Sequence, residues 1–216
     1  MSFGLLYMDE MKGFYKSNVM IVLWVGLPLI SILFHLLQPD MVGYSFAMLA
    51  SLVISSVGGS LASVMLSTSI ISEKNQHVYE LFLIRPIKRR SLLLAKFLAV
   101  YTCLLIASAI SILAGIMIDI ALRNMFPTSI LESISTSIAA MAISCSFGLL
   151  IGATVSSVAV GAILSIFVAN QLTTVSILPA IFTNLLNPLV FTTILGSSLT
   201  IALLTTAIVI FNRKQF

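Results

Sequence analysis

The chain has 216 residues, of which 59% are hydrophobic and only 8% are charged, and its formal net charge is +4. Roughly a quarter of the residues of an ordinary soluble domain are charged, so this composition excludes a soluble fold. Several apolar runs reach the roughly 20 residues that a helix needs to cross the hydrocarbon core of a bilayer. The sequence therefore predicts an integral membrane protein.

The apolar runs are typical of helices. A transmembrane barrel would alternate apolar and polar residues in short strands, whereas IVLWVGLPLISILFHLL is continuously apolar. We predict an all-α membrane protein with a single domain, residues 1–216, and six transmembrane helices. The expected spans are residues 19–37, 44–71, 92–118, 130–155, 158–178 and 190–211.

The segment before the first span is predicted to be an amphipathic helix in the membrane interface. Apolar residues recur there at helical spacing, with charged residues roughly opposite, although Leu5 and Glu10 lie on the wrong sides. The apolar set is Phe3, Tyr7, Met11 and Phe14. A short frayed extension is the alternative. Charged residues ahead of a long apolar run, with no small-residue cleavage site after it, favour a retained segment over a signal peptide.

The fourth and fifth spans must be separated by a turn. Between residues 130 and 178 the only charged residue is Glu132. One helix of about 49 residues would be about 73 Å long, more than twice the hydrocarbon thickness. The polar, glycine-containing sequence TVSSVAVG at residues 154–161 is the expected turn.

The basic residues predict the orientation. With the N-terminus inside, every Lys and Arg except Arg123 lies on the cytoplasmic side, and an even number of spans places both termini there. The segments 38–43, 119–129 and 179–189 then face outward. The last of these segments belongs to the stretch PAIFTNLLNPLVF, residues 179–191. Its prolines and asparagines disfavour one continuous helix and favour a re-entrant element on the outer side, between the fifth and sixth spans.

Small residues are expected to serve packing. Gly148 and Gly152 form a G-x-x-x-G pair and SVGGS at residues 56–60 is a second small-residue patch. Contacts within the chain are the expected use, and contacts between two chains are the alternative. Cys103 and Cys145 lie in apolar segments, where packing as small hydrophobic side chains is expected.

Catalytic and ion-coupling motifs are not found in the sequence. Residues 133–212 contain no Asp, Glu, Lys, Arg or His, although ion-driven transporters usually need an ionisable residue inside the membrane. A metal motif, a nucleophile with its base and a GxxxxGK[ST] loop are also absent. We therefore expect a protein that is not an enzyme, has no cofactor or metal of its own and binds no nucleic acid. If ATP energy is used, a partner must supply it.

The segment EKNQHVYELFLIRPIKRRSLLLAK, residues 73–96, concentrates the charge. If this segment forms a helix, one side of it is a polar stripe, and another side carries Val78, Leu81 and Phe82. Pro86 should end the helix near Ile84. The polar stripe is Glu73, Gln76, His77 and Glu80. The basic residues at positions 85–90 could serve only to fix the topology and to contact anionic membrane lipid. These two roles would not explain the acidic stripe, which favours a docking surface for a protein.

These residues resemble the pattern of the ABC-2 type transporter permeases. That family has, after the second span, a Glu, a second Glu with a following Leu, a proline, a basic residue and a Lys. The matching residues here are Glu73, Glu80, Leu81 or Leu83, Pro86, Arg89 and Lys96. His77 and Val78 stand where the family commonly has Gly-Thr, and Ala95 where it has a Gly before the Lys. The layout resembles the family along the whole chain, and the motif does so over about 25 residues.

The resemblance implies a dimer of six-span subunits in the cell membrane, each docking a separate ATPase, which would hold the ATP and Mg²⁺. It assigns the coupling helix to residues 73–84, with Glu73, Gln76, His77, Glu80, Leu81, Pro86 and Arg89 as ATPase-coupling residues. It also implies a second, smaller cytoplasmic contact, which would comprise Thr154, Ser156 and Ser157.

The sequence is compatible with more than one function. The first hypothesis is an ATP-driven exporter of an amphiphilic or apolar substrate, whose path lies at the dimer interface and includes the second and fifth spans. A permease of the haem-exporting type has a similar length and a similar loop. The alternative from another class is a passive channel or membrane scaffold subunit that has no ATPase partner.

Overall fold

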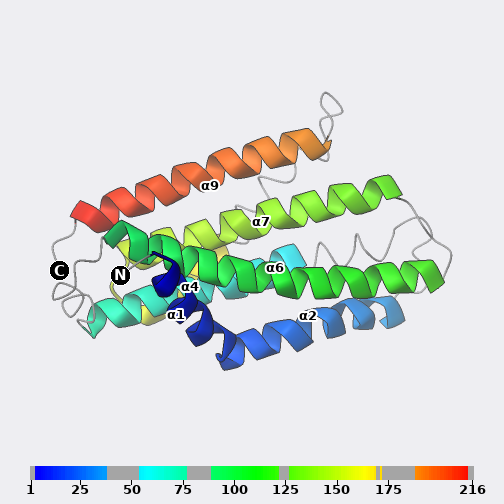
Figure 1. Ribbon diagram of the computed structural model, residues 1–216, viewed down its shortest axis with the longest axis horizontal. Helices are drawn as coiled ribbons and strands as arrows, with labels where there is room; N and C mark the ends of the chain where they lie inside the picture. Colours follow the sequence, from blue (N-terminus) through cyan, green and yellow to red (C-terminus); the bar gives the residue numbers. More distant parts are fainter. Residues whose placement is uncertain are drawn as a thin grey trace.

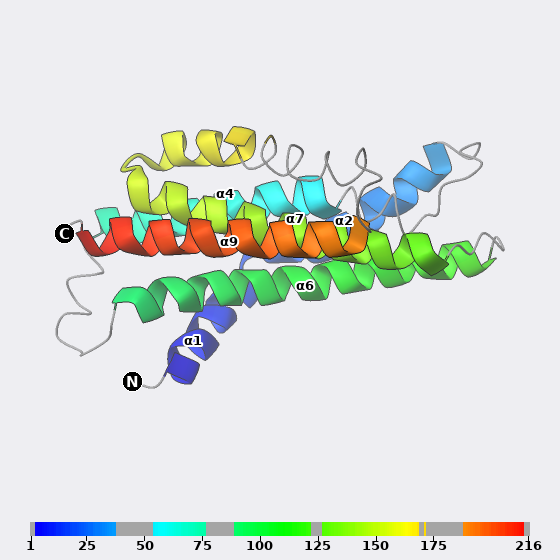
Figure 2. The same ribbon diagram turned by 90° about the horizontal axis from the view of Figure 1, so that it is seen from above.

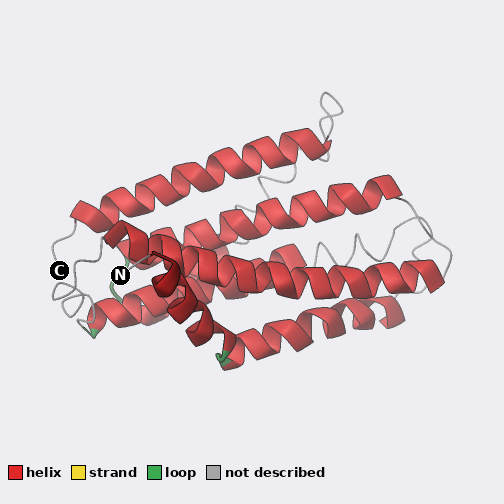
Figure 3. Ribbon diagram, in the orientation of Figure 1, coloured by secondary structure: helices red, strands yellow, loops and turns green. Residues whose placement is uncertain are grey.

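The computed structural model describes residues 3–37, 54–76, 89–121, 127–168, 171 and 188–213, and these form an α-helical bundle (Figures 1 and 3). In chain order the helices are α1 (Phe3–Tyr15), α2 (Asn18–Leu37), a π-helical turn η1 (Ile54–Gly58), α4 (Gly59–Asn75), α6 (Arg89–Ala121), α7 (Pro127–Thr154) and α9 (Pro188–Arg213). A further apolar helix, Val158–Val168, follows α7. No strand occurs among the described residues.

Four of these helices are long and apolar enough to cross a membrane: Ser55–Asn75, Arg90–Met117, Ile134–Thr154 and Val190–Arg213. The number rises to five if α1 and α2 are counted as one bent span. The all-helical membrane fold is thus confirmed, and the described part of the chain accounts for four to five of the six predicted spans. The first part of the predicted second span and most of the predicted re-entrant element, residues 179–187, lie outside the described residues.

Helix boundaries differ from the predicted spans by a few residues. α4 continues past Ile71 to Asn75, and α6 begins at Arg89 rather than Leu92. Both extensions add polar or basic residues that a hydropathy pattern assigns to a loop. Hydropathy locates the apolar stretch of a helix, whereas backbone hydrogen bonds can continue beyond it into the headgroup region.

Three of the described helix ends that carry basic residues lie together. These are the end of α4, the start of α6 and the end of α9, which are at the same end of the bundle (Figures 1 and 2). The ends of α2 and α6 and the start of α7 lie toward the opposite end (Figure 1). This arrangement agrees with the one-sided distribution of Lys and Arg along the sequence.

α1 is bent by 67° from the first part of α2. The break falls at Lys16 and Ser17, just before Asn18, and Ser and Asn are residues that favour helix N-termini. A helix forms where the sequence predicted one. Its predicted apolar face contacts the bundle in part: Phe14 is buried and Tyr7 and Met11 pack against the core, while Phe3 is exposed.

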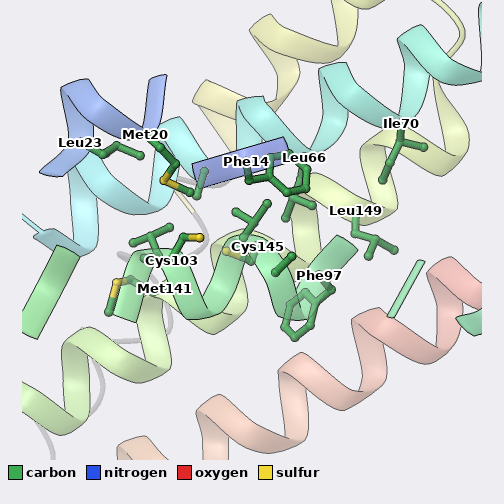
Figure 4. Close-up of a cluster of buried hydrophobic side chains, with 14 of the residues drawn as sticks. Phe14, Met20, Leu23, Leu66, Ile70, Phe97, Cys103, Met141, Cys145 and Leu149 are labelled. Atoms are coloured by element: carbon green, nitrogen blue, oxygen red, sulfur yellow. The ribbon is translucent and has the colours of Figure 1, made fainter. Parts of the chain in front are cut away.

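The core lies between α2, α4, α6 and α7, and α1 contributes Phe14 to it (Figure 4). Met20, Leu66, Phe97 and Leu149 represent four of these helices in one continuous cluster. Cys103 and Cys145 are buried in the same cluster as free thiols, as the sequence predicted.

The G-x-x-x-G pair brings α4 and α7 into close contact. A Cβ atom added at Gly148 would lie 2.5 Å from the carbonyl oxygen of Ser63, and one added at Gly152 would lie 3.0 Å from Cβ of Ile70. Only glycine therefore fits at position 148. The predicted use of this pair within the chain is confirmed.

Large apolar side chains remain exposed on the outer faces. Val22 on α2, Met117 on α6 and Phe167 on the Val158–Val168 helix are 62%, 70% and 67% exposed. Exposed hydroxyl groups on α9 donate to carbonyls of their own helix, as Ser197 does to Ile194 at 3.0 Å. Such a surface suits a lipid environment, because its polar groups need no water.

Candidate functional site

Three of the predicted coupling residues lie in the described part of the chain. Glu73 lies in the last turn of α4, Gln76 follows that helix directly, and Arg89 is the first residue of α6. The other four, His77, Glu80, Leu81 and Pro86, lie outside the described residues. The expected coupling helix thus begins inside α4, so that Glu73 belongs to the bundle. Its role in docking an ATPase stays a prediction.

Glu73 is part of a buried ion cluster at this end of the bundle. Nζ of Lys96, on α6, donates to Oε1 of Glu73 at 2.5 Å and to Oε2 of Glu10, on α1, at 3.0 Å. The side chain of Lys96 is 2% exposed, that of Glu10 is 19% exposed and that of Glu73 is 25% exposed. We call Glu10, Glu73 and Lys96 the Lys96 cluster.

The cluster explains why Glu10 departs from the amphipathic pattern of α1. An ammonium group as deeply buried as Lys96 is costly unless it is paired and hydrogen-bonded. Glu10 lies on the side of α1 that meets α6 and supplies one of the two carboxylates. Because α1 is short and packs on the bundle at an angle, the sequence alone did not show which helix this side faces.

The carboxyl group of Glu10 is not fully compensated. α1 lies outside the four candidate spans. Burial raises the pKa of Glu10 above its ordinary value of 4.5, although the Lys96 ammonium acts in the opposite direction. The negative charges of Glu73 and Asp9 raise this pKa further. The cluster thus has two carboxyl groups for one ammonium group.

Neighbouring side chains hold the cluster in position. Oγ of Ser69 donates to Oε1 of Glu73 at 3.3 Å, and Nζ of Lys96 lies 5.8 Å from the centre of the Phe14 ring. The hydroxyl groups of Tyr7 and Thr102 make a second link between α1 and α6, at 2.9 Å. α1 is thus fixed to α6 by two polar contacts of different types.

The predicted second cytoplasmic contact lies beside the end of α4. The turn at residues 155–157 joins α7 to the next helix, and Thr154, Ser156 and Ser157 are exposed there. Nδ2 of Asn75 donates to the carbonyl of Ser156 at 3.1 Å, and Nζ of Lys74 reaches the carbonyl of Val155 at 3.5 Å. The structure thus brings the last turn of α4, which also carries Glu73, against the turn predicted as the second contact.

An open groove of about 690 Å³ lies next to the Lys96 cluster. All three residues of the cluster line it, together with residues of the α1–α2 bend, a face of α4 and Val158. The predicted substrate path included the second and fifth spans, which supply α4 and Val158. Within the described residues, no group of three His, Cys, Asp or Glu side chains that could hold a metal ion occurs.

Sequence reasoning missed Glu10, Asn75 and the pairing of Lys96. The only signal for Glu10 was its place on the apolar side of an otherwise amphipathic helix. Comparison of the sequence with protein-family models and with curated proteins finds no match.

Proposed function

We propose that this chain is the permease subunit of an ATP-driven exporter of the ABC-2 type, which works as a dimer with a separate ATPase docked on residues 73–90. The dimer lies in the cell membrane with both termini of each subunit cytoplasmic. Its substrate is amphiphilic or apolar. ATP and Mg²⁺ are held by the ATPase, and this chain supplies the membrane path and the coupling segment.

One observation carries the proposal. The end of α4 leads into the expected docking segment, and it is tied to three other parts of the bundle. Glu73 is linked through Lys96 to α6 and α1, and Asn75 is bonded to the turn after α7. A displacement imposed on the docking segment by an ATPase would therefore act on several helices at once.

Coupling requires that the two states of the ATPase make different contacts with the docking segment. The short, largely buried bonds of the Lys96 cluster suit the transfer of such a difference, since they resist separation more than exposed ion pairs do.

The test is co-purification of the tagged chain from its native membranes, followed by identification of nucleotide-binding partners and measurement of ATP hydrolysis. We expect an ATP-binding cassette ATPase to be retained. Glu80→Lys should weaken its retention or reduce substrate-stimulated hydrolysis. The matched control is Asp119→Lys, which makes the same change of charge. Asp119 lies in the last turn of α6, at the end of the bundle opposite to the C-terminus of α4.

Two results would contradict this function. One is a chain that is intact and dimeric in native membranes but retains no ATPase. The other is an equal effect of Glu80→Lys and Asp119→Lys, which would mean that the position of the charge does not matter. Either result would favour the passive channel or scaffold.

A further inference from the structure

The groove beside the Lys96 cluster is amphipathic along its length. On α4 its lining includes Leu61, Met65, Thr68 and Ser72, which recur at i, i+4, i+7 and i+11 and therefore share one face of the helix. From Leu61 to Glu73 the rise along α4 is about 18 Å. The lining changes over this length from apolar, through hydroxyl-bearing, to charged.

The charged end of the groove carries excess negative charge. Glu10, Glu73 and Lys96 are the ionisable residues among the described ones that line it. Two carboxylates and one ammonium leave one formal negative charge. Lys96 is itself buried and donates to both carboxylates, so its charge is already paired on the side away from solvent.

Each carboxylate also has an oxygen that is still able to accept a hydrogen bond. Lys96 donates to Oε2 of Glu10, while Lys96 and Ser69 both donate to Oε1 of Glu73. Among the described residues, no donor pairs with Oε1 of Glu10 or with Oε2 of Glu73. The ring of Phe14, which also lines the groove, can add a favourable contact with a cation.

We propose that this groove binds an organic cation with an apolar body, with its positive charge beside Glu10 and Glu73 and its apolar part against Leu61, Val64 and Met65. Its volume of about 690 Å³ is within the range of pockets that hold such molecules. Binding requires this chain only, so the inference is independent of the ATPase proposed above.

A second groove provides a contrast. It lies between α6, α7 and α9 and has a volume of about 510 Å³. Apolar and hydroxyl-bearing residues such as Leu131, Ile138 and Ser197 line it, and no Asp, Glu, Lys, Arg or His is among its described lining residues. Its described lining therefore offers no formal charge that would select the sign of a ligand's charge. Of these two grooves, the one at the Lys96 cluster combines apolar length with charged lining residues.

A membrane lipid with an ammonium headgroup fits the site less well than a free cation. Its phosphate would be held next to the ammonium, close to Glu10 and Glu73, where it adds a third negative charge. Like charges at this distance in a partly buried site are strongly unfavourable. We therefore assign the groove to a cation that carries no attached anion.

The experiment measures binding of radiolabelled tetraphenylphosphonium to the purified, full-length chain in neutral maltoside micelles by scintillation proximity. Tetraphenylborate has nearly the same size and shape with the opposite charge, and serves as the matched probe. We expect saturable binding of the phosphonium, at least about tenfold tighter than that of the borate because the site attracts one sign of charge and repels the other.

Two pairs of variants locate the binding. Glu10→Gln should weaken phosphonium binding by about tenfold, while Asp9→Asn, an equal loss of charge at an exposed neighbour outside the groove lining, should have a much smaller effect. Gly13→Phe should block the groove. Gly4→Phe is its control, because a Cβ atom at either glycine meets nothing within 4 Å and only Gly13 lines the groove.

Each variant is first checked for thermal unfolding and monodispersity, and the Gly13 pair keeps the test valid if Glu10→Gln alters folding. The proposal is overturned if phosphonium binding is not saturable, if phosphonium and borate bind equally, or if both members of a pair behave alike. Displacement of the phosphonium by phosphatidylethanolamine at equal concentration would also overturn it, since the site would then belong to a lipid.

Discussion

Lys96 of α6 is joined to Glu73 of α4 by a hydrogen bond of 2.5 Å inside a region where the lysine side chain is only 2% exposed. The same ammonium group reaches Glu10 of α1, so one side chain connects three helices. The two residues that follow Glu73 in α4, Lys74 and Asn75, bond to the turn at residues 155–157.

Lys96→Met should destabilise the protein strongly. It leaves two partly buried carboxylates near each other without a cation, and loss of one partner from a buried ion pair costs about 3–5 kcal/mol, an upper bound here because both carboxylates are partly exposed. Thermal unfolding of the purified protein, followed by the fluorescence of Trp24, measures the effect. The triple variant Lys96→Met, Glu10→Gln, Glu73→Gln should recover most of the loss. A single variant as stable as the parent would contradict the burial of this cluster.

Glu10→Gln should be tolerated at neutral pH and should change the pH dependence of stability. Because burial raises the pKa of Glu10, the folded state binds its proton more tightly than the unfolded state. This residue's contribution to stability is therefore fully present below its ordinary pKa of 4.5 and is lost as pH rises through the raised value.

Unfolding of the parent and of Glu10→Gln is measured from pH 4 to pH 7. We expect the difference between them to shift in favour of the variant as pH rises across this window, since glutamine does not titrate. Lys96, Glu73 and Asp9 are the charged groups that act on Glu10, and they remain in both proteins. A difference that stays constant with pH would show that Glu10 titrates as an ordinary exposed residue.

Gly148→Ala should destabilise the bundle by about 1–3 kcal/mol, the usual cost of overpacking. The added methyl group would meet the backbone of Ser63 at 2.5 Å from its carbonyl oxygen, and a backbone cannot move aside as a flexible side chain can. Gly26→Ala is the control, because its Cβ atom meets only a side-chain carbon of Val22, at 3.9 Å. That change should be neutral or stabilising, as expected for alanine in a helix. Equal effects on unfolding would mean that α4 and α7 are not in close contact.

Ser67 and Ser165 should show a small positive coupling. Oγ of Ser165 donates to Oγ of Ser67 at 2.8 Å, and both side chains are buried between α4 and the Val158–Val168 helix. Hydrogen bonds between membrane helices contribute about 0.6 kcal/mol on average. Stability measurements on both alanine variants and on the double variant give this value directly. A coupling of zero would indicate that the two helices are separated at this point.

Several features could be predicted from sequence because they depend on local pattern. The α-helical fold, the helix before the first span, the turn near residue 155 and the close-packing role of Gly148 and Gly152 each follow from composition, periodicity or residue size within one segment. Helix ends were less accurate, as at Asn75 and Arg89. Hydropathy does not report where backbone hydrogen bonds stop.

The sequence by itself determined that this chain is helical and apolar enough to lie in a membrane, because apolar length and composition are properties of the chain read in order. Only the tertiary structure decided that Glu10, Glu73 and Lys96 meet, and that Asn75 joins α4 to the turn after α7. Lys96 is 86 residues from Glu10 and 23 from Glu73. Pairing over such separations depends on how helices pack and on the angle of α1, which no local pattern encodes.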